Sequence, residues 1–322
     1  MRPLITIRRI PNINFMGMRT LGFVLSGLMT IASIVLFFTQ GLNYGIDFSG
    51  GTIIEVRSTA GPADLGKMRS DLDSLGLHVT LQNFGGPEDV LIRLQEQSDK
   101  TQEQTVNQVK QKLGNSFEYR RTEVVGPTVG AELIKAGVEA TVLALFAIAV
   151  YVWFRFEWPF GVGAMLSTLH DTITTVGLFS LLQIEFNLTT LAAILTIAGY
   201  SINDTVVIYD RVRETMRRYK SMDLAELINK SLNETLSRTI LTVSTTALAV
   251  LSLLLFGGEV LRGFSIAMLW GIVVGTYSSL FIAAPILYYI RPKRASGGDG
   301  GSGGGSASAP VSRETVSAGR KS

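Results

Sequence analysis

The segment Leu188–Asp210, LTTLAAILTIAGYSINDTVVIYD, is apolar for most of its length, yet it contains the carboxylate of Asp204. A helix of about 20 residues crosses a bilayer, so this run predicts a membrane span. An acid inside such a run costs roughly 2.5–3.5 kcal/mol on insertion scales. A chain tolerates that cost where the acid meets a partner, a proton or a water-filled path. The segment therefore predicts both a membrane fold and a candidate functional residue.

The composition of the whole chain agrees with a membrane protein. Of its 322 residues, 47% are hydrophobic and only 17% are charged, and the mean hydropathy is positive. The chain has no cysteine, which excludes disulfides and thiolate metal sites. It also has no HExxH, Walker or GxSxG motif, so we expect no enzyme activity, no metal, no cofactor and no nucleic acid partner. Any work that the protein does must then use an ion gradient or its partners.

Further apolar stretches predict a polytopic α-helical membrane protein. Six runs are long enough to span the bilayer: 19–39, 136–154, 159–182, 187–210, 239–257 and 263–290. Basic residues gather before the first run, between the second and third, after the fourth and after the sixth. By the positive-inside rule, both termini are cytoplasmic and the segment between the first two spans faces outward.

These spans divide the chain into five parts. Between the terminal parts lie the first span, an outward domain and the other five spans, which include an amphipathic segment along the cytoplasmic interface. The Gly- and Ser-rich end of the chain is expected to be disordered. The boundaries are 1–18 for the cytoplasmic N-terminus, 19–39 for the first span, 40–135 for the outward domain, 136–290 for the other spans with 211–236 at the interface, and 291–322 for the tail.

The outward domain has a pattern that predicts a small α+β fold. Strands are expected at 52–57, 78–84, 89–95 and 117–125, and helices at 62–75 and 101–113. The order βαββαβ is that of the ferredoxin-like split unit, which gives a fold and no function. The domain either grips a partner or serves as a spacer. Before its first strand, Gly50-Gly51 predicts positive φ or a close backbone contact, either in a tight turn, which is the favoured reading, or in a hinge.

The polar residues inside the spans are the candidate site. Asp204 either exchanges a proton or forms a fixed bond with Asn203, Ser201 or a neighbouring helix, and the first reading is the default for an intramembrane acid. Arg238 begins the next apolar run, where it either pairs with Asp204 or extends to the lipid headgroups. Two further candidates lie in the third span, where His170 and Asp171 either relay protons or order the bundle as a packed polar pair. Asn203, in the fourth span, is likewise a candidate for the relay or for helix packing.

Glycines in the last spans predict close helix packing. Gly271 and Gly275 form a small-xxx-small pattern that lets helices approach one another. Such packing suits helices that slide, and static bundles use it too.

Several motifs resemble the SecD/SecF family of bacterial protein-export membrane proteins, and within it the SecF branch. They are GIDFSGGT at 45–52, the His170-Asp171 pair, GYSINDTVVIYDRVRE at 199–214, LSRTILT at 236–242 and FGGEVLRGFSIAMLWGIVVGTYSS at 256–279. The resemblance implies a six-span half of a transporter related to the RND superfamily in the bacterial inner membrane. Asp204 and Arg238 fall at the family's intramembrane Asp and Arg.

The resemblance also implies partners and a driving force. SecD would supply the other half of a heterodimer that works beside the SecYEG channel, with YajC and YidC as further partners, on a translocating polypeptide. The proton motive force would drive this export, although the sequence leaves sodium open as the coupling ion. The alternative function is a non-titrating scaffold that stabilises the translocon. A small-molecule efflux pump fits the six spans but fits the small outward domain poorly.

Overall fold

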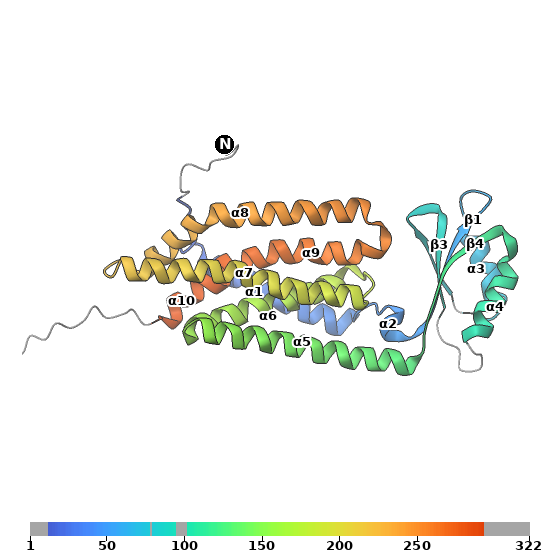
Figure 1. Cartoon of the computed structure of the whole chain (residues 1–322), viewed down its shortest axis with the longest axis horizontal. Helices are drawn as coiled ribbons and strands as arrows, with labels where there is room; N and C mark the ends of the chain where they lie inside the picture. The colour runs from blue at the N-terminus through green and yellow to red at the C-terminus, as the bar shows by residue number, and fades with distance from the viewer. Residues whose placement is uncertain (1–11, 78, 95–101, 293–322) are drawn as a thin grey trace, which may run out of the picture. The chain divides into compact units, whose positions relative to one another are not determined.

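The computed structural model describes residues 12–77, 79–94 and 102–292 (Figure 1). Residues 1–11 of the expected N-terminal part, and all but 291 and 292 of the expected tail, lie outside the described residues. The described part consists mostly of long helices with one small sheet domain. The long helices are α1 (Arg19–Gln40), α5 (Pro127–Arg155), α6 (Trp158–Leu182), α7 (Leu188–Arg218), α8 (Leu224–Phe256) and α9 (Gly258–Ser278), and a π-helix, Ser279–Ala283, joins α9 to α10 (Ala284–Ile290).

Five segments of the described chain are long and apolar enough to cross a membrane. They are Arg19–Gln40, Thr128–Arg155, Leu188–Arg218, Leu224–Phe256 and Val260–Ile290. The remaining expected span corresponds to α6, which has 25 residues. His170, Asp171 and several Ser and Thr residues make α6 more polar, so it does not belong to that set.

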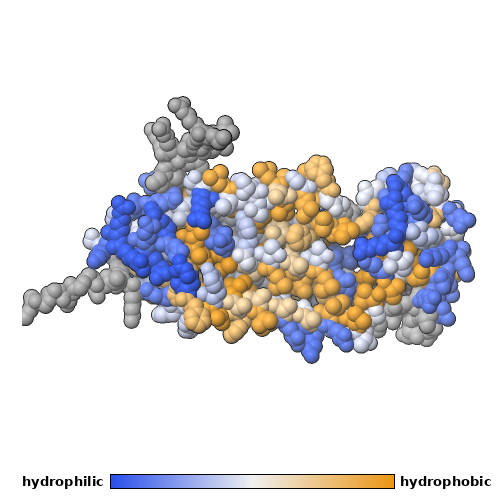
Figure 2. Space-filling view, viewed as in Figure 1, coloured by the Kyte–Doolittle hydropathy of each residue, from blue (hydrophilic) through white to orange (hydrophobic). Residues whose placement is uncertain are grey.

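The helices divide into an inner and an outer group. The apolar windows of α5 and α8 are only 6% and 11% buried, whereas that of Val260–Ile290 is 61% buried. In Figure 2, hydrophobic residues cover the middle of the helical part, and hydrophilic residues gather at its two ends. An exposed apolar band of this kind is expected where lipid surrounds the protein. The inner helices α6, α7 and α9 therefore hold the polar residues away from lipid.

The helix ends follow local sequence signals. Asn187 caps α7, because its side chain accepts a hydrogen bond from the Thr190 amide at 3.0 Å. The Thr190 hydroxyl accepts from the Asn187 amide at 2.9 Å, which completes a capping box. Helix α5 starts with Pro127, a residue whose missing N–H costs nothing at this position.

The sheet domain contains a four-stranded antiparallel sheet in the order β2-β3-β1-β4. Its elements are β1 (Gly51–Ser58), α3 (Leu65–Asp73), β2 (Val79–Phe84), β3 (Gly86–Leu94), α4 (Gln102–Leu113), a 3-10 turn (Gly114–Ser116) and β4 (Phe117–Val125). The strand and helix order βαββαβ is the predicted one. Alternate residues of the strands, such as Ile54, Val56, Val90 and Ile92, are buried in the domain's own core.

Residues 211–236, the expected interfacial segment, belong to two helices. They form the last turns of α7 and the first turns of α8, which meet at a short turn. The apolar residues that suggested an amphipathic surface helix, Leu227, Ile228 and Leu232, are fully buried. Their partners include Val212 and Met216 of α7. The apolar face of each helix end thus has a protein neighbour to pack on, which composition alone does not reveal.

Candidate functional site

Asp204 lies on α7 and faces α8. The Thr239 hydroxyl of α8 donates a hydrogen bond to Oδ1 of Asp204 at 2.7 Å. Oδ2 of Asp204 is shielded from solvent and has no hydrogen-bond partner among the described residues. A buried acceptor without a donor is costly. This oxygen is therefore open to a proton or to a new donor.

Arg238 precedes Thr239 on α8, but its side chain is exposed. The ion pairs of the described residues include none between Arg238 and Asp204. The predicted acid–base contact is therefore not formed in this structure, and Thr239 makes the contact between the two helices instead. Both readings of Arg238 stay predictions.

Asp171 is fully buried at the centre of a polar cluster. Its Oδ2 accepts hydrogen bonds from Ser201 of α7 at 2.5 Å and from Ser278 of α9 at 2.8 Å. Its Oδ1 lies 3.0 Å from Nδ1 of His170, and the Ser167 hydroxyl donates to Ser278 at 2.8 Å. These five residues are called the Asp171 cluster below. Through it, one carboxylate joins α6, α7 and α9.

His170 extends the cluster toward α1. Its ring centroid lies 6.3 Å from that of Tyr277. The Tyr277 hydroxyl donates to the Gly22 carbonyl of α1 at 2.7 Å and lies 2.9 Å from the Ser26 hydroxyl. Nε2 of His170 is buried without a hydrogen-bond partner among the described residues. The cluster thus has one free ring nitrogen next to a satisfied carboxylate.

Helix α7 carries contacts to both acids. Ser201, which bonds Asp171, and Asp204 are three residues apart and so lie on one side of the helix, separated by about 4.5 Å of rise. One residue further along α7, the Thr205 hydroxyl lies 2.8 Å from that of Ser279 in the π-helix. Asn203, the other candidate on this helix, is exposed and belongs to neither contact.

Among the hydroxyl residues that complete the site, the sequence singled out only Ser201, as a partner of Asp204. These hydroxyl residues are Ser167, Ser201, Thr205, Thr239, Ser278 and Ser279. Serine and threonine in a helix mostly bond their own backbone, so their presence says little about a neighbour. The signals available were the spacing of Ser201 from Asp204 and the Ser278-Ser279 pair at the start of the π-helix. Single-turn π segments occur often at functional sites.

The close packing predicted for Gly271 and Gly275 is confirmed. A Cβ on Gly271 would lie 2.3 Å from the Ile197 side chain of α7, and one on Gly275 would lie 3.1 Å from Cβ of Ser201. Side chains larger than hydrogen would push α9 away from α7. These glycines thus set the short helix separation that lets Ser278 and Ser201 meet the same carboxylate.

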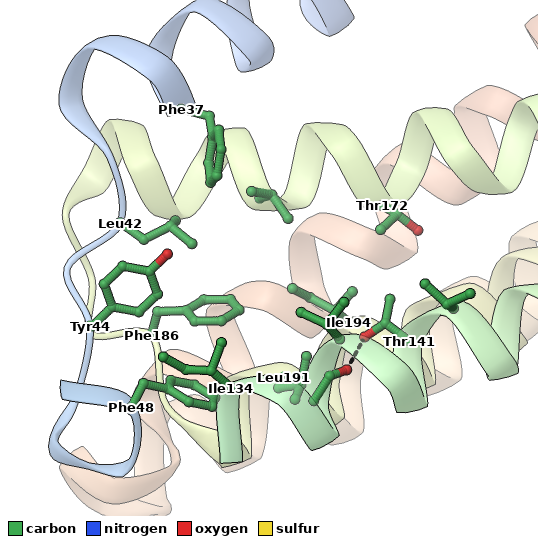
Figure 3. A pocket seen from close by; sticks show the side chains of 14 residues that line it. Phe37, Leu42, Tyr44, Phe48, Ile134, Thr141, Thr172, Phe186, Leu191 and Ile194 are labelled. Carbon is green, nitrogen blue, oxygen red and sulfur yellow. Dashed lines mark hydrogen bonds between the residues drawn. The ribbon is translucent and has the colours of Figure 1, made fainter. Parts of the chain in front are cut away.

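The connection from α1 to the sheet domain is anchored on the α6–α7 loop. It contains the short helix α2 (Ile46–Ser49), and its end has the predicted positive φ, 70° at Gly50 and 128° at Gly51. The Phe48 ring stacks on Phe186 with centroids 5.7 Å apart. Both rings border an apolar cavity of about 330 Å³ among α1, α5, α6 and α7 (Figure 3). Its lining is mostly apolar, with Tyr44 as the one titratable side chain among the residues that line it.

One ion pair ties the sheet itself to the same loop. Arg93 of β3 pairs with Glu185, and both side chains are largely shielded. Burial lowers the pKa of the Arg93 guanidinium from its ordinary value. No sequence pattern predicts this pair, because the two residues are 92 positions apart.

The described residues contain no group of three or more His, Asp and Glu side chains that could hold a metal ion. What the site offers is two acids in one helical bundle, one with every oxygen satisfied and one with a free oxygen. Such groups can hold and exchange a proton, and their partners sit on different helices.

Family models match most of the chain. Residues 105–293 match the model described as protein export membrane protein SecD/SecF, C-terminal, and residues 35–61 match the SecD/SecF GG motif. The chain is 48% identical over 289 residues to the protein translocase subunit SecF of Rickettsia rickettsii, covering 87% of this chain and 94% of that protein. The corresponding protein of Rickettsia felis is 47% identical over 289 residues, with the same coverage.

Solved structures agree with this. The crystal structure of SecDF, a translocon-associated membrane protein from Thermus thermophilus, superimposes with a TM-score of 0.80 at 36% identity. A structure of SecDF in a super-membrane-facing form gives a TM-score of 0.68 at 36% identity. In both cases the match covers 90% of this chain but only 40% of the SecDF chain.

Proposed function

The chain belongs to the SecD/SecF family of protein-export membrane proteins, and from this premise we propose that it uses the proton motive force to promote protein translocation. It is a multi-pass membrane protein whose relatives are SecF subunits of the protein translocase. The match covers 40% of the SecDF chain, and this likeness supports a SecD partner. The working unit is therefore a SecD–SecF pair.

The observation that carries the proposal is the state of Asp204. Its carboxylate lies in a membrane helix with one oxygen bonded to Thr239 and the other without a donor. A proton on the free oxygen would remove the cost of the unmatched acceptor and of the charge. Rotation of α8 by about 100° would replace Thr239 by Arg238, the preceding residue on that helix. Asp204 would then alternate between a neutral state and an ion-paired state.

The Asp171 cluster supports this mechanism, because it would keep the inner helices in place relative to one another. Asp171 holds α6, α7 and α9 together through bonded oxygens, and Ser201 attaches α7 to it beside Asp204. The inner helices would then move as one body when α8 shifts. His170 keeps a free nitrogen, which leaves it as a second proton acceptor in the same bundle.

The remaining architecture of the proposal follows the family. With α6 counted, six helices cross the membrane, and the orientation with both termini in the cytoplasm agrees with the basic residues at the α7–α8 end. The order β2-β3-β1-β4 with antiparallel neighbours supports a ferredoxin-like outward domain. SecYEG, YajC, YidC and the translocating polypeptide are the further partners.

Proton flux through the reconstituted SecD–SecF pair tests the proposal. We expect Asp204→Asn to abolish flux and gradient-dependent export while leaving the pair assembled, because Asn keeps the shape and loses the titratable group. Glu139→Gln is the control, since Glu139 is an exposed acid on α5. If vesicles that contain the Asp204→Asn variant show proton flux and protein export at wild-type rates, the proton-driven function is disproved. The non-titrating scaffold then becomes the better description.

A further inference from the structure

We propose that the end of the bundle where α7 approaches the α5–α6 turn binds the headgroup of an anionic phospholipid. A hollow of about 480 Å³ lies there, lined by Arg155, Asp210, Arg213, Glu214, Arg217 and Arg218. The lining contains four guanidinium groups and two carboxylates. Figure 2 shows hydrophilic residues concentrated at this end of the helices. The lining therefore carries more positive than negative charge.

The acids near the hollow are already engaged. Asp210 holds Arg155 with both of its oxygens at 2.7 Å, and Glu214 accepts from Arg211, outside the lining, at 2.6 Å. Among the described residues, no acid forms an ion pair with Arg213 or Arg217. These two arginines are four positions apart on α7, where like charges repel. A phosphate between them would replace that repulsion with charge-assisted hydrogen bonds.

The helix dipole does not account for all of the arginines that line the hollow. Arginines in the last turn of α7 are favourable at a helix C-terminus, which explains Arg217 and Arg218. Arg213 lies more than a turn before that end. Its guanidinium sits 5.5 Å from the Phe156 ring centre, and the guanidinium of Arg155 sits 4.7 Å from the same ring. A shared aromatic ring thus holds two cations at the mouth of the hollow.

Exposed aromatic residues beside the hollow identify its depth in the membrane. Trp153, Phe154 and Trp158 are 73%, 88% and 59% exposed at the α5–α6 turn. Tryptophan is enriched at the headgroup level of a bilayer. A group that meets the hollow at this depth is a lipid headgroup, with its acyl chains alongside Phe154 and the exposed face of α5. Basic pockets between membrane helices bind anionic headgroups by this chemistry.

Binding of phosphatidylglycerol to the purified, detergent-solubilised chain tests the proposal by native mass spectrometry. We expect the double variant Arg213→Gln/Arg217→Gln to weaken binding about tenfold or more. Lys110→Gln/Lys112→Gln, which removes the same charge from α4 of the sheet domain, is expected to bind as the wild type does. Arg213→Lys/Arg217→Lys should retain part of the binding, because it keeps charge and loses the planar fork.

Three results would overturn the proposal. Equal binding by the glutamine variant and the wild type would show that the hollow is not the site. Binding of phosphatidylcholine equal to that of phosphatidylglycerol would show that the charge of the headgroup does not determine binding. Displacement of the lipid by millimolar inorganic phosphate would assign the hollow to a free anion. Because the readout is lipid binding and not export, the result is independent of whether Asp204 carries protons.

Discussion

At the scale of single residues, the Thr239 hydroxyl determines how Asp204 is hydrogen-bonded in this structure. It is the one hydrogen-bond donor to Asp204 among the described residues. We predict that Thr239→Val slows proton flux by about two- to tenfold, since a hydrogen bond worth about 0.5–1.5 kcal/mol is lost. Thr239→Ser keeps the hydroxyl and should stay near wild type. If valine and serine give equal rates, the bond does not contribute to the cycle.

Arg238 allows a test that separates function from stability. Its side chain is exposed and has no ion pair with Asp204. We predict that Arg238→Met changes the free energy of unfolding by no more than about 0.5 kcal/mol, because exposed sites tolerate substitution. The same variant should abolish flux if Arg238 reaches Asp204 in another state. Wild-type flux in Arg238→Met would instead place this side chain among the lipid headgroups.

At the scale of helices, the close approach of α7 and α9 depends on Gly271. Its Cβ position is 2.3 Å from an Ile197 atom, so Gly271→Val should destabilise the protein by about 1–3 kcal/mol through overpacking. Gly199→Ala is the matched control on α7, since nothing lies within 4 Å of its Cβ position. It should be neutral or stabilising by up to about 1 kcal/mol. Thermal unfolding in detergent measures both, and equal effects would contradict the packing argument.

The Asp171 cluster gives a second prediction at this scale. Asp171→Ala would leave the buried Ser201 hydroxyl without its acceptor, while the Ser278 hydroxyl keeps the Gly275 carbonyl at 3.1 Å. We expect a loss of about 2–4 kcal/mol of stability, and a smaller loss for Asp171→Asn, which still accepts hydrogen bonds. Unfolding measured as for Gly271→Val tests this. A stable Asp171→Ala variant that nevertheless lacks proton flux would assign Asp171 to the relay and not to structure.

At the scale of the whole molecule, the Arg93–Glu185 pair links the sheet domain to the α6–α7 loop. A proton at Asp204 acts on a polypeptide outside the membrane only through a conformational change with two arrangements. We predict that Arg93→Cys/Glu185→Cys, locked by a short bismaleimide, loses gradient-driven export. The chain has no other cysteine, and the same variant without cross-linker is the control. Full export by the locked protein would make this domain a passive spacer.

A structural feature of this protein is predictable from its sequence when the interactions that determine it are local. The spans, the βαββαβ order and the positive φ at Gly50 and Gly51 depend on local run length, periodicity and backbone sterics, which the sequence contains directly. The same local reasoning recognised the apolar face of residues 211–236 but not its neighbours, because it had no means of seeing that α7 and α8 pack against each other there.

The sequence by itself determined that the protein lies in a membrane and that Asp204 is the residue to explain. An acid inside an apolar run has a free-energy cost in the bilayer whatever its neighbours are. Only the tertiary structure decided the partners of that acid. It paired Asp204 with Thr239 in place of Arg238, and it joined Asp171 to Ser201 and Ser278. Helix rotation and separation fix such contacts, and both result from packing between segments that are distant in the chain.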